Sequence, residues 1–168
     1  SLLDPTQSNY LAAVVSDTAS AKSNAAIYGV SWIELSTGRF VVTVASQEEV
    51  ADILARLAVS EILCPEEEME FVRSCSADAM LTSRPTWSSA IDHATEGLLK
   101  QFGVASLEGF GLEPRDRPGI RAAGGILEYL KETQNSRLEH IDCLASYRHT
   151  ECVEIDQATW RSLEISRT

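Results

Sequence analysis

The stretch that decides the fold lies at residues 28–45 and reads YGVSWIELSTGRFVVTVA. Two runs rich in β-branched and aromatic residues, Tyr28–Leu35 and Phe40–Ala45, flank the short segment STGR at positions 36–39. Such runs favour extended strands, and Gly38 can adopt the positive φ angle that a tight turn needs. The stretch therefore predicts a β-hairpin.

An amphipathic helix is predicted directly after the hairpin. Ser46 and Glu49 have the spacing of a capping box, in which the two side chains each bond a backbone N–H group at the start of a helix. Apolar residues then recur at helical spacing. These residues are Val50, Ile53, Leu54 and Leu57. Together the two signals predict an amphipathic helix that starts after Ser46.

Shorter segments on both sides of this helix complete a sheet. The apolar run Tyr10–Asp17 predicts a first strand. Glu61–Cys64 and Met80–Arg84 predict two more strands that each end before a proline, with a short acidic helix at Glu66–Arg73 between them. Three antiparallel strands followed by parallel crossovers would produce this order. The sequence therefore predicts an α/β fold with a mixed β-sheet flanked by helices, in a ribonuclease-H-like topology.

Two longer helices are predicted in the second half of the chain. The first begins with Asp92 as N-cap and ends at Gly103, a natural residue for a helix C-terminus. Its apolar face consists of Ala94, Leu98 and Phe102. The second has Pro118 in its first turn and runs to about Thr133.

Glycines inside the second helix predict a close contact. Gly124 and Gly125 each cost about 1 kcal/mol relative to alanine in a helix interior. We therefore expect them to permit the close approach of another backbone.

The last part of the chain predicts weak strands and the start of a further helix. Ile141–Tyr147 and Cys152–Ile155 alternate weakly and are expected to pair with each other. Asp156–Ile165 reads as a capped helix start, and the sequence stops three residues later. A helix this short needs a packing partner. We therefore expect the chain to be a piece of a larger protein.

Composition and charge narrow the classes of function. The chain has 168 residues and a formal net charge of −11, from 25 acidic and 14 basic residues. This charge opposes non-specific nucleic-acid binding, which depends on Lys and Arg displacing counterions from phosphates. No apolar run approaches the ~20 residues that span a bilayer, so we expect no membrane contact and a cytoplasmic location. The four cysteines show no paired spacing and predict reduced thiols, with Cys64 in the core.

A metal-dependent nuclease is one alternative that the fold class invites. Such an enzyme needs about four carboxylates that converge on metal ions, one of them inside the first strand. Tyr10–Val15 contains no acid, and Asp17 comes only at the end of that run. Other acids are scattered: Glu34, Glu48, Glu49, Glu61 and Glu66–Glu68. The nuclease reading is therefore weak, and solvated or capping roles explain these acids more simply.

A small zinc-stabilised domain is the second alternative. His140, Cys143, His149 and Cys152 are four competent ligand types within thirteen residues. If both segments are strands, residues three apart point to opposite faces and each pair is split. We therefore expect the cysteines to be small apolar fillers and the histidines to lie at the surface.

Several ordered motifs carry a family resemblance. They are GVSWIELSTGRF at 29–40, QFGVASLEGFGL at 101–112, AAG at 122–124, YLKETQ at 129–134 and Asp-x-Ala-Thr at 156–159. Together they resemble the connector domain of the bacterial MutS mismatch-repair family, and the resemblance covers essentially the whole chain. It implies a connector at 1–155, with a sheet-forming half at about 1–85, a helical half at about 86–135 and returning strands at about 140–155. Residues 156–168 would be the first turns of the core domain.

The resemblance implies a part without catalytic, cofactor or metal residues of its own. This family reads mismatches with a Phe-x-Glu motif in a preceding domain, and the chain contains no such motif. The family hydrolyses ATP with Mg in a following domain. Here Gly119 and Gly124 are followed by Gly125-Ile126, where a phosphate-binding loop needs Lys and then Ser or Thr. We therefore expect no enzyme in this chain, an ATPase in the parent, and mismatched DNA bound only by the full-length protein.

The resemblance also implies partners and a role. The connector of this family lies between the mismatch-binding and ATPase domains, relays ATP-dependent rearrangement and offers a docking surface to MutL. We expect His93, Glu96 and Lys100, with their neighbours on the exposed face of one helix, to contribute to that surface. A merely solvated face is the plain alternative. The parent is expected to be a homodimer, while the state of this chain alone stays open, with a monomer one option.

The chain departs from the family pattern at two places. The family usually has Arg-Arg-Asn where this chain has Trp160-Arg161-Ser162, so we do not expect all of the contacts that Arg and Asn make there in the family. Gly97 stands in mid-helix where the family tends to have a good helix former, which lowers the local stability of the helix proposed to dock.

Overall fold

The computed structural model describes residues 10–16, 27–83, 91–133, 141 and 144–147, with the backbone alone at 91–93. Its strands are β1 (Tyr10–Ser16), β2 (Ile27–Glu34), β3 (Arg39–Ser46), β4 (Glu61–Cys64), β5 (Met80–Ser83) and β6 (Leu144–Ser146). Its helices are α1 (Gln47–Leu57), α2 (Met69–Cys75), α3 (Ile91–Phe102) and α4 (Arg117–Thr133). Three short 3-10 turns join them: η2 (Glu66–Glu68), η3 (Glu108–Phe110) and η4 (Pro114–Asp116).

The strands form one mixed sheet in the order β5-β4-β1-β2-β3-β6. β2 runs antiparallel to both β1 and β3, whereas β4 is parallel to β1 and β5 is parallel to β4. The predicted α/β class with a mixed sheet is therefore confirmed. The order of the first five strands also fits the ribonuclease-H-like topology.

The hairpin has the predicted boundaries to within one residue. β2 pairs with β3 from Ile27 opposite Ser46 to Glu34 opposite Arg39. Gly38 closes the turn with a φ of 79°, and its N–H group donates to the carbonyl of Glu34 at 2.8 Å. Any residue with a Cβ would be strained at that angle.

The sequence did not predict the position of β6, which forms one edge of the sheet beside β3. β6 pairs in parallel with β3, from Phe40 opposite Leu144 to Val42 opposite Ser146. We had expected this segment to pair with Cys152–Ile155, which lies outside the described residues, as does 156–168. β6 extends the sheet beyond β3, and local sequence does not indicate this pairing.

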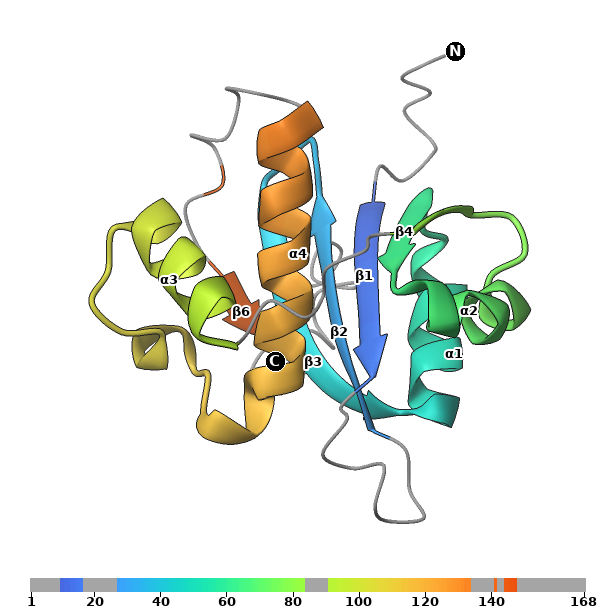
Figure 1. Cartoon of the computed structure of the whole chain (residues 1–168), viewed down its shortest axis with the longest axis horizontal. Coiled ribbons are helices and arrows are strands. Elements are labelled where there is room, and N and C mark those ends of the chain that lie inside the picture. Colours follow the sequence, from blue (N-terminus) through green and yellow to red (C-terminus); the bar gives the residue numbers. More distant parts are fainter. Residues whose placement is uncertain (1–9, 17–26, 84–90, 134–140, 142–143, 148–168) are drawn as a thin grey trace, which may run out of the picture.

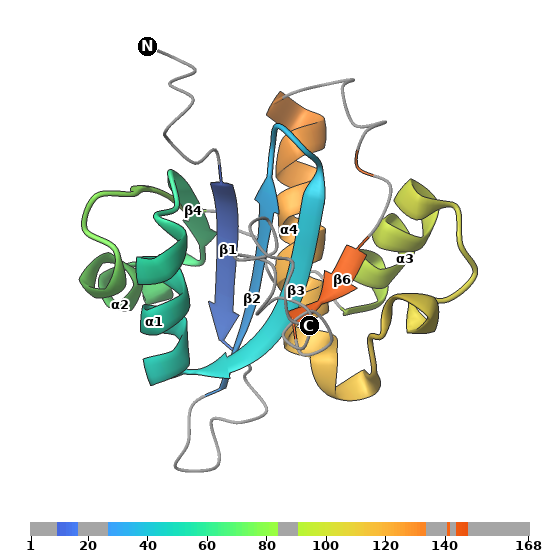
Figure 2. The same cartoon turned by 180° about the vertical axis from the view of Figure 1, so that it is seen from behind.

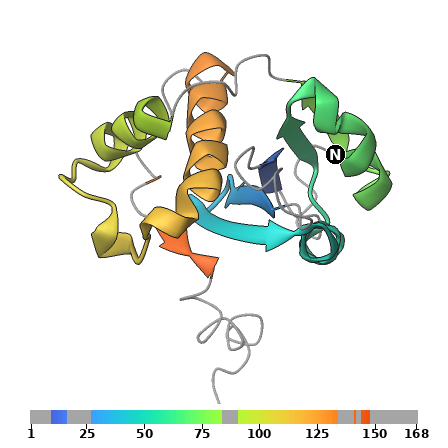
Figure 3. The ribbon, with the colours of Figure 1, turned by 60° about the horizontal axis from the view of Figure 1, so that its bottom comes forward.

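Two helical layers cover the two faces of the sheet (Figures 1 and 2). α3 and α4 lie on one face, and α1 and α2 lie on the other, as the third view also shows (Figure 3). Successive residues of β1 alternate between these layers: Leu11, Ala13 and Val15 face α4, whereas Ala12 and Val14 face α1. β1 is therefore buried on both faces, which explains its uninterrupted apolar sequence.

The capping box at the start of α1 is confirmed. Ser46 Oγ accepts a hydrogen bond from the N–H of Glu49 at 3.3 Å, and Glu49 Oε1 accepts one from the N–H of Ser46 at 2.8 Å. Val50, Ile53 and Leu54 are buried against the sheet. The predicted apolar face is thus the face that packs.

α4 lies unusually close to the strands beneath it. A Cβ at Gly29 of β2 would collide with the carbonyl oxygen of Pro118, and a Cβ at Gly119 would lie 2.5 Å from the carbonyl oxygen of Thr43. Backbone therefore meets backbone where the first turn of α4 crosses β2 and β3. Further along α4, a Cβ at Gly124 would lie 2.6 Å from Ala94 Cβ, so the predicted close approach is confirmed for Gly124.

α3 differs from the prediction at its start and agrees with it at its end. It begins at Ile91, so Asp92 lies inside the first turn and the prediction of Asp92 as N-cap is wrong. An acidic residue is favoured both at the N-cap and in the first turn, because both positions lie at the positive end of the helix dipole. At the other end, Gly103 has a φ of 65°, as expected of a residue that terminates a helix.

Candidate functional site

The outer face of α3 contains the residues that the sequence selected for docking. Ala94 and Leu98 are buried in the core, while Glu96 and Lys100 are exposed on the same helix. His93 also belongs to α3, but its side chain lies outside the described residues. The structure therefore places Glu96 and Lys100 on one helix and away from the core.

Glu96 and Lys100 stand one helical turn apart without bonding each other. Opposite charges at this spacing, with the acid first, are suited to stabilise a helix. Yet within the described part of the chain neither side chain makes an ion pair. An ion pair between Glu96 and Lys100 therefore does not contribute to the stability of α3 in this structure.

An exposed apolar residue, Val104, follows the end of α3. The N–H of Gly103 donates to the carbonyl of Lys100, and the N–H of Val104 donates to the carbonyl of Leu99, which together form a Schellman motif. Val104 is 37% exposed, and Leu99 is half-buried. In this motif an apolar contact between these two positions is common, so the helix end itself accounts for Val104.

Glu34 and Glu49, two of the acids considered for a nuclease, have structural tasks. Glu34 accepts hydrogen bonds from the hydroxyls of Ser36 and Thr37, both at 3.2 Å, within the hairpin turn. Glu49 serves the capping box of α1. Among the described residues, no three His, Cys, Asp or Glu side chains are grouped so that they could hold a metal ion. Asp17 lies outside the described residues.

Glu61 makes a contact that the sequence did not reveal. Its Oε2 atom accepts a hydrogen bond from Thr82 Oγ1 at 2.7 Å and another from Tyr129 Oη at 2.7 Å. The three residues belong to β4, β5 and α4. No local pattern indicates a bond between residues 68 positions apart, so it could be found only in the folded chain.

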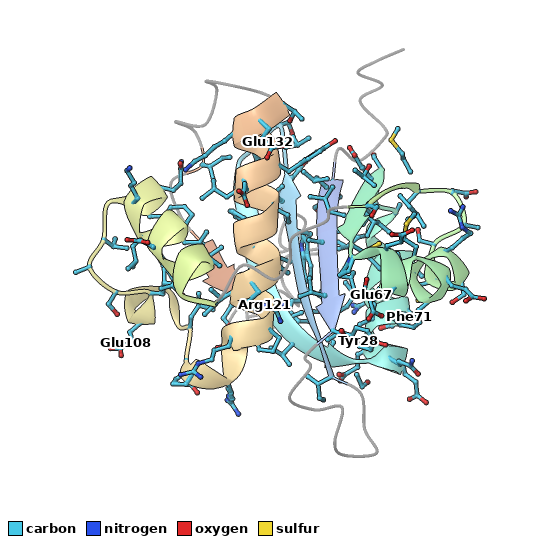
Figure 4. All side chains as sticks on the ribbon, in the orientation of Figure 1. Tyr28, Glu67, Phe71, Glu108, Arg121 and Glu132 are labelled. Carbon is cyan, nitrogen blue, oxygen red and sulfur yellow. The ribbon has the colours of Figure 1, made fainter. Side chains whose placement is uncertain are left out.

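Aromatic side chains of β2 and α2 pack together in the α1–α2 layer. Tyr28 of β2 and Phe71 of α2 stack with ring centroids 4.9 Å apart, and Gln47 of α1 donates to Tyr28 Oη at 3.4 Å. Both rings of the stack are labelled in Figure 4. The stack fixes α2 against the strand, which gives the aromatic residues a packing role.

The zinc alternative lies outside the residues that the structure describes, because His140, Cys143, His149 and Cys152 all fall there. Cys64 and Cys75 are free thiols. Burial raises the pKa of Cys64 from 9.0 to about 11, with a further increase from Glu68 and a decrease from Arg73. Burial also raises the pKa of Cys75. Neither thiol is activated as a nucleophile, because both are held in the protonated form.

Among the described residues, no helix is both long enough and apolar enough to cross a membrane.

Comparisons with known proteins agree with the motifs. A family model described as MutS domain II matches residues 9–142. The DNA mismatch repair protein MutS of Rhodopirellula baltica is 40% identical over 180 residues, covering 99% of this chain and 20% of that protein. The MutS proteins of Salinibacter ruber and Chlorobium chlorochromatii are each 34% identical and cover 98% of this chain, with 18% and 19% of their own lengths. The chain thus spans about a fifth of the length of these relatives.

Proposed function

The chain belongs to the MutS mismatch-repair family, as its domain II, and on this basis we propose that it is a non-catalytic connector that relays ATP-dependent rearrangement and offers a docking surface to MutL. ATP and Mg would be bound by another domain of the parent, and mismatched DNA by the full-length protein. The cytoplasm of a bacterium is the expected location.

The outer face of α3 is the proposed docking surface, which we define as His93, Glu96 and Lys100. One observation carries this proposal: Glu96 and Lys100 are exposed at a spacing that suits an ion pair, yet they form none within the described residues. Charged groups left unpaired at a surface can pair with a partner at little desolvation cost and set its orientation. The inner face of α3 packs on α4, so the outer face can bind without disturbing the core.

Exchange of the two charges tests this surface. The double variant Glu96→Lys/Lys100→Glu in the full-length parent keeps the net charge and should keep the fold, because both side chains are exposed. We expect recruitment of MutL to fall by about tenfold or more, since like charges placed opposite one another across an interface cost several kcal/mol. Recruitment is measured with immobilised mismatched DNA, ATP and purified MutL.

A matched pair on α4 provides the control. Glu128 and Lys131 are also an exposed acid and base on one helix. The variant Glu128→Lys/Lys131→Glu should recruit MutL as the unmodified protein does. Unchanged recruitment by the α3 variant, or an equal loss in both variants, would show that the α3 face is not the docking surface.

A further inference from the structure

β5 is the outermost strand at one edge of the sheet, next to β4. The N–H of Met80 donates to the carbonyl of Ser60 at 2.9 Å, on the β4 side. In a parallel pair the backbone groups of alternate residues face the partner strand, so those of Leu81 and Ser83 point away from β4. No hydrogen bond joins this outer side to another described residue. The outer side of β5 is therefore an open edge, where a further strand can pair.

Apolar side chains lie on both faces of this edge. Met80 is 62% exposed. It stands opposite Glu61, whose side chain bonds Tyr129 of α4, so Met80 lies on the α4 side of the sheet. Leu81 is half-buried and packs in the α1–α2 layer on the other side. A strand that fits this edge therefore needs one apolar side chain on each face.

The segment before β1 enters the sheet at the end from which this edge can be reached. Leu11 stands beside Glu61, which stands beside Met80. A strand added outside β5 would lie three strand spacings from β1, or about 14 Å. Residues 5–9 span at most about 17 Å when extended, which is enough to cross that distance. Residues 1–4 would then run antiparallel to β5, because they approach the end of the sheet at which β1 and β5 begin. Both ranges lie outside the described residues.

We propose that the first four residues, which read SLLD, pair with the outer side of β5 as an antiparallel strand. Leu2 and Leu3 are consecutive, so one side chain lies on each face of the sheet. One leucine covers Met80, and the other extends the apolar contact of Leu81. Pro5 follows directly and has no N–H to donate, so the pairing ends where the chain turns towards β1. The segment that leads into β1 is thereby fixed to the edge of the sheet opposite β6.

Amide hydrogen exchange, measured by NMR for single residues of the chain, tests this pairing. The variant Leu2→Asp/Leu3→Asp removes both apolar side chains. We expect the amides of Leu81 and Ser83 to exchange about tenfold faster in the variant, because their N–H groups lose their acceptors. The amide of Thr82 faces β4 and should not change. Equal exchange rates of Leu81 and Ser83 in the variant and the unmodified chain would overturn the proposal.

Gln7→Asp/Ser8→Asp is the matched control. It adds the same two negative charges to the same segment, in the part that only crosses towards β1. Exchange at Leu81 and Ser83 should stay as in the unmodified chain. An equal acceleration in both variants would assign the effect to charge and overturn the apolar contact. Protection that grows with protein concentration would also overturn the proposal, because a second copy of the chain would then pair with β5.

Oxidation by hydrogen peroxide gives a second measurement, at the side chain. Met69 and Met80 are the two methionines of the chain, and Met69 is half-buried in the α1–α2 layer. We expect the sulfoxide of Met80 to form several-fold more slowly in the unmodified chain than in Leu2→Asp/Leu3→Asp, because a leucine covers the sulfur only in the former. The rate at Met69 should be the same in both. Peptide mass spectrometry measures the rates, and an equal rate at Met80 in the two proteins would contradict the proposed contact.

Discussion

The two helical layers meet the same sheet in different ways. α4 approaches β2 and β3 so closely at Gly29 and Gly119 that backbone touches backbone. α1 instead fills the space with side chains, chiefly Val50, Ile53 and Leu54. The α4 layer therefore cannot accept an added atom at its glycines, whereas the α1 layer cannot lose one without leaving a cavity.

The starts of the helices differ in charge as well. α1 has Glu48 and Glu49 in its first turn, where the helix dipole favours acidic residues. α4 has no acid in its first turn and begins with Arg117, a charge that the dipole opposes. α1 thus carries its acids within its first turn, whereas the acids at the start of α4, Glu113 and Asp116, form a capping box in η4 directly before the helix.

Gly29→Ala should break this contrast most severely. The new Cβ would collide with the carbonyl oxygen of Pro118, and neither backbone can move without disturbing the sheet. Overpacking of a core costs about 1–3 kcal/mol and occasionally more, so we expect a loss of about 3 kcal/mol or no folding at all. Urea unfolding followed by circular dichroism measures the effect.

Gly97→Ala is the matched control for that substitution. A Cβ at Gly97 would meet nothing within 4 Å, and the residue lies in the interior of α3. We expect a gain of about 0.5–1 kcal/mol from the better helix former. If Gly29→Ala were as stable as Gly97→Ala, the close seating of α4 would be wrong.

Leu54→Ala tests the other layer, where a missing group should matter. Leu54 is 1% exposed under α1, so the substitution leaves a cavity and should cost about 2–5 kcal/mol in the free energy of unfolding. Leu57→Ala on the same helix should cost clearly less, because Leu57 is half-buried. Equal losses at the two positions, measured by urea unfolding, would contradict the packing described for α1.

The sequence predicted those elements whose signals are local. The hairpin at 28–45 carries its own turn glycine, and α1 carries its own capping box and apolar face. Gly124 was also predictable, because a glycine inside a helix is costly unless something packs against it. Local signals were sufficient for these elements because each one depends on residues within a few positions of one another.

The features that were missed depend on distant residues. β6 pairs with β3 across about a hundred positions, and its parallel register has no local signal. Tyr129 and Glu61 are 68 positions apart in sequence, and neither residue type predicts the other. Of the candidate docking residues, the sequence could predict that Glu96 and Lys100 are exposed, because helical spacing sets them apart from Ala94 and Leu98. It could not show that they form no ion pair, which is a property of the folded side chains.

Cys64 offers the smallest and most local comparison, between two thiols of the α1–α2 layer. Burial raises the pKa of Cys64 to about 11, while Cys75 is only half-buried and its pKa is also raised. At about pH 8 iodoacetamide should therefore modify Cys75 much faster than Cys64, because the thiolate is the reactive form. Because the pKa of Cys64 is raised from its ordinary 9.0 to about 11 in the folded state, this contribution to stability is complete below about pH 9 and is lost as the pH rises towards 11. Peptide mass spectrometry measures both rates, a denaturant should make them equal, and equal rates in the folded chain would show that Cys64 is not buried.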